Sequence, residues 1–313
     1  MKEKILIVCG DPNSINSELI FKCWRKINNS LKKKIYLIGN YNLMKAQFKK
    51  LKYKTKIQEV ENINNDIKTN NLKIINVDLS FKKPFDVSYE KTSRYVLKSL
   101  NFAHKLALQK NVKGLINCSV NKLLLKKGNM GVTEYLAKKC STKKNSEVML
   151  IRNKKFSVSP ITTHIDIKNV TRTLNKELIK KKSITVDSWF RKYLHKKPLI
   201  GMLGLNPHNS ELRKSSEEIK IIIPAIKELK RKNVKIYGPL VPDTTFIKDF
   251  KKYDIILGMY HDQVLTPIKT LFEYDAINIT LGLPFIRISP DHGPNEKMLG
   301  KNLSNPLSLI RAI

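Results

Sequence analysis

Glycine is scarce in this chain, with 12 glycines among 313 residues, whereas an average protein has about 7%. No G-x-G-x-x-G string follows an apolar run, so the dinucleotide-binding fingerprint of a Rossmann domain is absent. The sequence pattern by itself therefore gives no sign of a nicotinamide cofactor.

Long apolar runs and paired cysteines are also missing. No stretch reaches the roughly 18 apolar residues of a transmembrane helix. The opening string MKEKILIVCGDP is typical of a first strand rather than of a signal peptide. The four cysteines form no C-x-x-C pair, and we expect free thiols in a reducing, cytoplasmic compartment.

Acidic residues are few, with 26 Asp and Glu against 60 Lys and Arg, which gives a net charge of +34. A surplus of this kind occurs in proteins that bind nucleic acid or membrane surfaces. However, only nine of the basic residues are arginine, the lysines are spread along the whole chain, and no arginine-rich stripe with interleaved aromatic residues appears. We interpret the charge as compositional drift and expect neither a membrane nor a nucleic-acid partner. A basic nucleic-acid-binding protein with a vestigial site remains the alternative of another class.

Short apolar runs rich in β-branched residues alternate with longer amphipathic stretches. The segment 88–110 has Val96, Leu100 and Ala103 on one helical face, and the segment 215–232 begins with the capping string SSEE. This alternation predicts an α/β fold with a largely parallel sheet, as one large domain or two lobes. Strands are expected at 4–9, 34–39, 72–77, 114–119, 147–152, 199–204, 234–238, 254–260 and 276–281.

Three of the six histidines share one context, because each follows an apolar run and has a carboxylate within three residues. They are His164 in VSPITTHID, His208 in LIGMLGLNPHNSE and His261 in IILGMYHDQ. The carboxyl ends of parallel strands form the ligand-binding edge of an α/β sheet. Three imidazoles at that edge are the donor set of a catalytic divalent-metal site. Their spacing matches no metal motif, so the pattern alone favours unrelated loop histidines over a metal site. His104 and His195 lie in helical patterns and are expected to be structural.

Residues that could bind an anion follow His261 in the sequence. Lys269, Asn278 and Arg287 supply two cations and an amide, which is what a phosphate or carboxylate needs. Each of them, taken singly, is also common as a surface or structural residue.

Five strings together resemble the 4-hydroxythreonine-4-phosphate dehydrogenase family of vitamin B6 biosynthesis. They are NPHNSE, GPLVPDTTF, YDIILGMYHDQVLTPIK, INITLGLPFIRISPDHG, and VNK followed by MGVTEYLA. The resemblance covers essentially the whole chain. It implies two α/β lobes with a cleft between them, similar to isocitrate and isopropylmalate dehydrogenases, and a homodimer with the site near the interface. We expect one lobe at about 1–125 plus 285–313 and the other at about 126–284.

The resemblance also implies the chemistry. The reaction would be a metal-dependent, NAD- or NADP-linked oxidation of 4-phosphohydroxy-L-threonine to a 3-keto acid. That acid would decarboxylate to 3-amino-2-oxopropyl phosphate, in pyridoxal 5'-phosphate biosynthesis. The cofactor would lie near the loops around Asn206 and His292, and Asp262 and Asp243 are candidates for catalysis or metal support. The implied metal ligands, for zinc, magnesium or cobalt, are His164, His208 and His261, and the implied substrate contacts are Thr133, Lys269, Asn278 and Arg287.

Three loops depart from the family pattern. In the loop 10–18, Ser14 and Asn16 stand where the family has glycines. Val132 replaces a histidine that is expected to touch the substrate phosphate, and Pro294 removes a backbone donor near the expected cofactor loop. The change to Val132 leaves open a paralogue that oxidises another phosphorylated hydroxy acid, such as threonate or erythronate phosphate.

Overall fold

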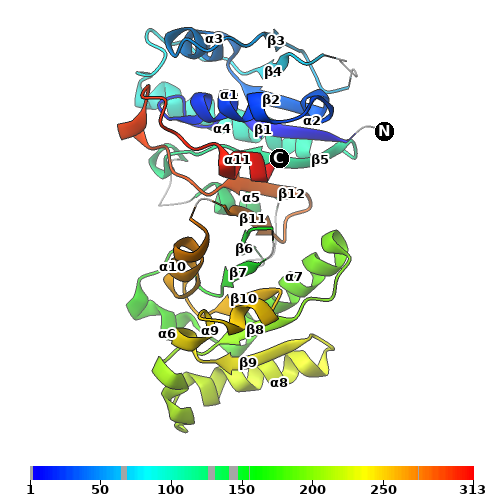
Figure 1. The fold of residues 1–313 in the computed structure, drawn as a ribbon, viewed down its shortest axis with the longest axis vertical. Helices are drawn as coiled ribbons and strands as arrows, with labels where there is room; N and C mark the ends of the chain where they lie inside the picture. Colours follow the sequence, from blue (N-terminus) through cyan, green and yellow to red (C-terminus); the bar gives the residue numbers. More distant parts are fainter. Residues whose placement is uncertain (1–2, 65–68, 126–130, 141–146, 155, 274) are drawn as a thin grey trace. The chain divides into compact units, whose positions relative to one another are not determined.

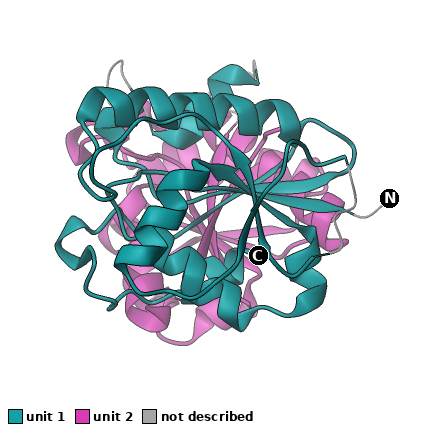
Figure 2. Cartoon of the chain, turned by 90° about the horizontal axis from the view of Figure 1, so that it is seen from above, with its two compact units in different colours: residues 1–140, 284–313 teal, residues 141–283 magenta. Residues whose placement is uncertain are grey.

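The α/β fold that the sequence predicts is present in two compact units (Figure 1, Figure 2). Unit 1 comprises Met1–Cys140 and Pro284–Ile313, and unit 2 comprises Ser141–Leu283. In the part of the chain that is described, no helix is long and apolar enough to cross a membrane. The computed structural model describes residues 3–64, 69–125, 131–140, 147–154, 156–273 and 275–313.

Unit 1 is built on a parallel sheet. Its strands are β1 (Lys4–Val8), β2 (Ile35–Gly39), β3 (Ile57–Glu59), β4 (Leu72–Asn76), β5 (Val112–Asn117) and β12 (Ile286–Pro290). They lie in the order β3-β4-β2-β1-β5-β12, and each paired neighbour is parallel. β2 is buried along its whole length, as expected for a parallel strand covered on both faces.

The helices of unit 1 include the long amphipathic helix that the sequence predicts. Val96, Leu100 and Ala103 are each 0% exposed, so the predicted face is the buried one. The helical segments are α1 (Asn16–Lys26), α2 (Asn29–Lys34), α3 (Tyr41–Lys50), α4 (Tyr89–Ala107), η1 (Lys122–Leu125), α5 (Val132–Lys139), η6 (Glu296–Met298) and α11 (Leu307–Ala312).

Unit 2 contains a mixed sheet. Its strands are β6 (Val148–Arg152), β7 (Ser157–Pro160), β8 (Ile200–Leu203), β9 (Ile236–Leu240), β10 (Ile255–Gly258) and β11 (Ile277–Leu281). The order is β11-β6-β7-β10-β8-β9. β6 is antiparallel to both of its neighbours, whereas β7, β10, β8 and β9 run parallel. The prediction of a largely parallel sheet is therefore confirmed.

Every expected strand is present within two residues at either end. The structure adds β3, β7 and β12, which read IQE, SVSP and IRISP. These strands are short and half polar, so an apolar run does not mark them.

The helical segments of unit 2 differ from expectation at one place. The expected helix at 215–232 is a π-helical turn followed by an α-helix that begins one residue before Pro224, whose ring removes a backbone N–H. The segments are η2 (Ile167–Asn169), α6 (Val170–Thr173), α7 (Lys176–Leu194), η3 (Pro207–Leu212), η4 (Glu218–Ile222), α8 (Ile223–Arg231), α9 (Pro242–Thr245), η5 (Asp249–Lys252) and α10 (His261–Phe272).

Side-chain hydrogen bonds link the carboxyl ends of the adjacent strands β7, β10 and β8. Thr162, after β7, donates its hydroxyl to the carbonyl oxygen of Met259 at 2.7 Å. Gln263 accepts from the backbone N–H of Met259 at 2.6 Å and donates to the carbonyl oxygen of Gly204 at 2.7 Å. The three strand-end loops are therefore held in one register.

Glu218 holds the loop that follows β8. It is 0% exposed, and its Oε1 accepts from the backbone N–H groups of Leu205 and Asn206 at 2.8 and 2.9 Å. The side-chain amide of Asn206 donates to its Oε2 at 3.0 Å. Burial alone raises the pKa of Glu218, but the hydrogen bonds from Asn206 and Leu205 outweigh burial, and the net result is a lowered pKa.

We expect Glu218→Gln to lower the free energy of unfolding by about 1–3 kcal/mol at pH 7, because the new NH2 group faces donors. A carboxylate with a lowered folded-state pKa stabilises above its unfolded pKa of about 4.3, and this stabilisation is lost as the pH falls through the folded value. The difference between the wild type and Glu218→Gln should therefore shrink as the pH falls below about 4.3. Urea unfolding at several pH values measures it.

The matched control is Glu177→Gln, because the Glu177 side chain is 73% exposed and a change there should stay within about 0.5 kcal/mol. Equal midpoints for the two variants at pH 7 would contradict the role given to Glu218.

Candidate functional site

The three histidines singled out by sequence follow three adjacent parallel strands of unit 2. His164 follows β7, His208 lies in η3 after β8, and His261 is the first residue of α10 after β10. β10 pairs in parallel with both β7 and β8. The carboxyl ends of these strands therefore share one edge of the sheet, where α/β proteins bind ligands.

His164 and His261 are close neighbours. Their ring centroids are 5.6 Å apart and the rings are tilted by 39°. Because zinc–imidazole bonds are about 2.0–2.1 Å long, rings at this separation fit two ligands of one ion. Nδ1 of His261 lies 2.6 Å from Oδ1 of Asp262. A carboxylate at Nδ1 orients the ring and directs Nε2 to a metal.

His208 does not join this pair in the structure. Its side chain is 70% exposed and its Nε2 lies 3.5 Å from Oδ2 of Asp243. Among the residues that the structure describes, no group of three or more His, Cys, Asp or Glu side chains is arranged to hold a metal. The donor types are those that bind a divalent ion, and of the three imidazoles only those of His164 and His261 are shown as close neighbours.

The backbone around His208 is strained. Five consecutive residues from His208 to Leu212 have φ between 49° and 58°. The left-handed conformation costs roughly 1–2 kcal/mol per residue without glycine. Strain of this kind is found where surrounding structure or function enforces it. Asn209 anchors the turn, because it is 7% exposed and its amide donates to the carbonyl oxygen of Pro239 at 3.1 Å.

Arg287 forms the centre of a buried cationic site in unit 1. It is 3% exposed, its Nε donates to Oδ1 of Asn117 at 2.7 Å, and its Nη1 donates to Oγ1 of Thr133 at 3.0 Å. Burial lowers the pKa of Arg287 to about 10, and the nearby carboxylate of Glu134 opposes this shift. The guanidinium is therefore charged at neutral pH.

Asn117 is a further candidate site residue, which the sequence analysis did not single out. It is the last residue of β5, and it fixes Arg287 on the neighbouring strand β12. An amide at the carboxyl end of a parallel strand is the signal that marks it. Thr133 lies in the first turn of α5, where the helix dipole favours an anion. Asn117, Thr133 and Arg287 together can position one anionic group.

Lys269 and Asn278 belong to unit 2. Lys269 lies on α10, eight residues after His261, which is about 12 Å along the helix axis. Asn278 lies on β11, and its Oδ1 is buried without a hydrogen-bond partner in the described part of the chain. A buried amide oxygen without a partner is costly, which makes Asn278 a candidate contact for a ligand.

In the loop 10–18, the side chains of Ser14 and Asn16, which stand where the family has glycines, form hydrogen bonds. Nδ2 of Asn16 donates to the carbonyl oxygen of Ser119 at 2.8 Å, and the Ser119 hydroxyl donates to Oδ1 of Asn16 at 2.8 Å. Ser14 donates to the carbonyl oxygen of Asp11. The loop still needs Gly10, where φ is +75° and a Cβ would lie 2.5 Å from the Ser119 carbonyl oxygen. Ser14 and Asn16 therefore replace glycine flexibility with hydrogen bonds.

The two loops expected near a cofactor differ in whether their polar groups already have hydrogen-bond partners. The backbone and side-chain N–H groups of Asn206 are occupied by Glu218. Nδ1 of His292 lies 3.0 Å from the carbonyl oxygen of Gly293, while its Nε2 is buried without a partner among the described residues. Burial lowers the pKa of His292. Pro294 lacks an N–H, but its carbonyl oxygen accepts from Ile15 at 3.2 Å, which joins this loop to the loop at 10–18.

Comparison with known proteins identifies close relatives. The 4-hydroxythreonine-4-phosphate dehydrogenase of Sulfurihydrogenibium sp. (strain YO3AOP1) is 37% identical over 316 residues, covering 99% of this chain and 96% of the relative. The D-threonate 4-phosphate dehydrogenase of Pectobacterium atrosepticum is 36% identical over 216 residues, covering 67% of this chain and 66% of the relative.

Solved structures agree with these relatives. The 4-hydroxythreonine-4-phosphate dehydrogenase of Klebsiella pneumoniae superposes with a TM-score of 0.86 at 28% identity, covering 100% of this chain and 98% of that one. A β-decarboxylating dehydrogenase of Thermococcus kodakarensis shares the fold alone, with a TM-score of 0.51 at 10% identity over 98% of this chain and 80% of that one.

A family model described as pyridoxal phosphate biosynthetic protein PdxA matches residues 26–313. This match spans most of the chain, and the first relative aligns over almost all of it. The chain therefore belongs to the PdxA family of pyridoxal phosphate biosynthetic proteins.

Proposed function

We propose that this protein is a 4-hydroxythreonine-4-phosphate dehydrogenase. It would oxidise 4-phosphohydroxy-L-threonine with NAD or NADP to a 3-keto acid, which loses CO2 to give 3-amino-2-oxopropyl phosphate. The alignment with a relative of that name over 99% of the chain carries the proposal. The free thiols, three of them buried, support a reducing, cytoplasmic compartment. The homodimer that the resemblance implies is part of the same proposal.

The anionic substrate would be held by the cationic site around Arg287. A planar guanidinium offers paired N–H donors that match phosphate or carboxylate oxygens. Asn117 and Thr133 fix Arg287 before the substrate arrives, so less ordering is needed on binding. For Lys269 and Asn278, which belong to unit 2, substrate contact is proposed from the family resemblance alone.

The imidazoles of His164, His208 and His261 would hold one divalent ion. A bound ion would act as a Lewis acid on the substrate hydroxyl, while the nicotinamide cofactor would accept the hydride. Three neutral nitrogen donors favour a borderline ion such as zinc over magnesium. Asp262 and Asp243 lie against His261 and His208 respectively, and their role is to orient these rings.

The full-length protein with substrate, NAD+ and a divalent ion should form NADH, measured by absorbance at 340 nm. We expect His261→Asn to lower kcat/KM by about 100- to 1000-fold or more, because a bound ion contributes several kcal/mol to the transition state. Removal of the ion by a chelator should abolish turnover, and zinc or cobalt should restore it.

His195→Asn is the matched control, since His195 ends α7 with φ +49°, a conformation that asparagine tolerates. This variant should keep wild-type activity. The absence of NADH with zinc, magnesium or cobalt would refute the proposed activity. Full activity in His261→Asn would refute the ligand assignment alone.

Oxidation of D-threonate 4-phosphate is the second candidate function. A relative of that name is 36% identical over two thirds of this chain. Val132, next to Thr133 in the first turn of α5, cannot donate a hydrogen bond to the substrate. The two substrates differ at carbon 2, where one carries an amino group and the other a hydroxyl group.

We expect kcat/KM for hydroxythreonine phosphate to exceed that for D-threonate 4-phosphate at least tenfold. Val132→His should lower KM about 5- to 150-fold, because one restored phosphate donor contributes about 1–3 kcal/mol. Val132→Leu, which adds size without a donor, should leave KM unchanged or higher. A preference for D-threonate 4-phosphate in the wild type would assign the second function instead.

A further inference from the structure

A hollow of about 920 Å³ opens on unit 1, and none of its lining residues is assigned to the candidate site. Three segments surround it: the second half of α1, the turn at 52–54, and the segment 302–306 that precedes α11. Its volume is in the range of about 300–1,000 Å³ that small-molecule sites occupy.

All the charged residues that line this hollow are basic. Five of its lining residues are basic, and no acidic residue lines it in the described part of the chain. Four of the five are exposed and form no ion pair with any other described residue. These four are Arg25, Lys26, Lys52 and Lys54.

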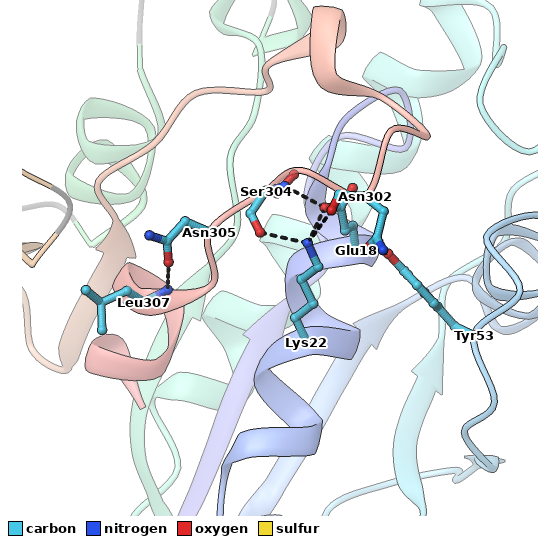
Figure 3. A network of polar contacts seen from close by, with 7 residues as sticks. All are labelled: Glu18, Lys22, Tyr53, Asn302, Ser304, Asn305 and Leu307. Carbon is cyan, nitrogen blue, oxygen red and sulfur yellow. Dashed lines mark hydrogen bonds and ion pairs between the residues drawn. The ribbon is translucent and has the colours of Figure 1, made fainter.

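Lys22, the fifth, fixes one wall (Figure 3). Its Nζ contacts Oε1 of Glu18 at 2.8 Å and donates to the carbonyl oxygens of Asn302 and Ser304 at 2.9 Å each. The backbone N–H of Ser304 donates to the same Oε1 of Glu18 at 2.7 Å. The negative charge of Glu18 is therefore matched by Lys22, and the four exposed cations are left in excess.

The aromatic part of the hollow is equally fixed. The rings of Phe21 and Tyr53 are stacked, with centroids 3.9 Å apart and an angle of 4°. The Tyr53 hydroxyl donates to Oδ1 of Asn302 at 2.6 Å, an interaction that Figure 3 also shows. Burial and the charge of Glu18 raise the pKa of Tyr53 to about 12, so this donor stays protonated. The hollow is thus formed before any ligand binds.

We propose that this hollow binds a small polyanion with two or more linked phosphate groups, of about nucleotide size. The cations lie on two segments, α1 and the turn at 52–54, and linked phosphates offer more oxygens to these cations than one orthophosphate does. Lysine and arginine are the side chains that bind phosphate oxygens most strongly. The volume of the hollow fits a small molecule, whereas a nucleic-acid strand needs a groove that follows its backbone.

Titration calorimetry of the full-length protein at about 150 mM salt tests the proposal, because exposed long-range attraction is screened beyond about 8 Å there. We expect tripolyphosphate to bind at one site per chain, at least tenfold more tightly than orthophosphate, and adenosine not to bind. Comparing ATP with tripolyphosphate distinguishes a nucleotide from inorganic polyphosphate. Tighter binding of single-stranded DNA than of either would overturn the proposal.

Two variants locate the site. Lys52→Asn with Lys54→Ser should raise the Kd for tripolyphosphate at least tenfold, and asparagine tolerates the φ of +56° at position 52. The control, Lys227→Ser with Lys235→Ser, removes two exposed charges from unit 2 and should change the Kd less than twofold. Arg25→Ser with Lys26→Ser gives a second test if the first variant loses its wild-type melting temperature.

Equal weakening in the hollow and control variants would show non-specific attraction and refute the site. Displacement of tripolyphosphate by NAD+, with unchanged binding in both hollow variants, would assign it to the candidate active site instead. Neither result depends on dehydrogenase activity, so failure here is separate from failure of the proposed function.

Discussion

The hydrogen bonds of Gln263 are the constraint on which the candidate metal site depends. One amide accepts from Met259, at the end of β10, and donates to Gly204, at the end of β8. Thr162 adds the end of β7 through the same Met259. Three histidines that are far apart in sequence therefore follow strand ends held together by two polar side chains. Both side chains are at least nine-tenths buried, so losing either leaves buried backbone groups without partners.

The candidate anion site and the candidate metal site differ in how much of their geometry is formed before a ligand binds. Arg287 is buried and fixed by Asn117 and Thr133, so its geometry exists before a ligand binds. His208 is exposed in a left-handed turn. Because Glu218 holds the loop before that turn and Asn209 anchors the turn itself, movement would be confined to a few residues. In our proposal, His208 would supply the third imidazole together with His164 and His261.

The sequence predicted much of the fold because buried parallel strands are nearly continuous apolar runs. KILIV and IYLIG are examples, whereas the half-polar strands SVSP and IRISP carry no such mark. Helical periodicity placed α4 correctly. The other expected helix, at 215–232, is divided near Pro224 into a π-turn and an α-helix. The histidines were found from their position after apolar runs. Asn117 and Gln263 were not, because their role comes from contacts between segments that lie far apart in sequence.

The central claim is that His164, His208 and His261 bind one divalent ion together. X-ray absorption at the zinc edge of the zinc-loaded protein tests it most directly, because imidazole scattering counts the histidine ligands. The account predicts three imidazole nitrogens at about 2.0–2.1 Å and two in His208→Asn. Two or fewer imidazoles in the wild type, or an unchanged spectrum in His208→Asn, would contradict it.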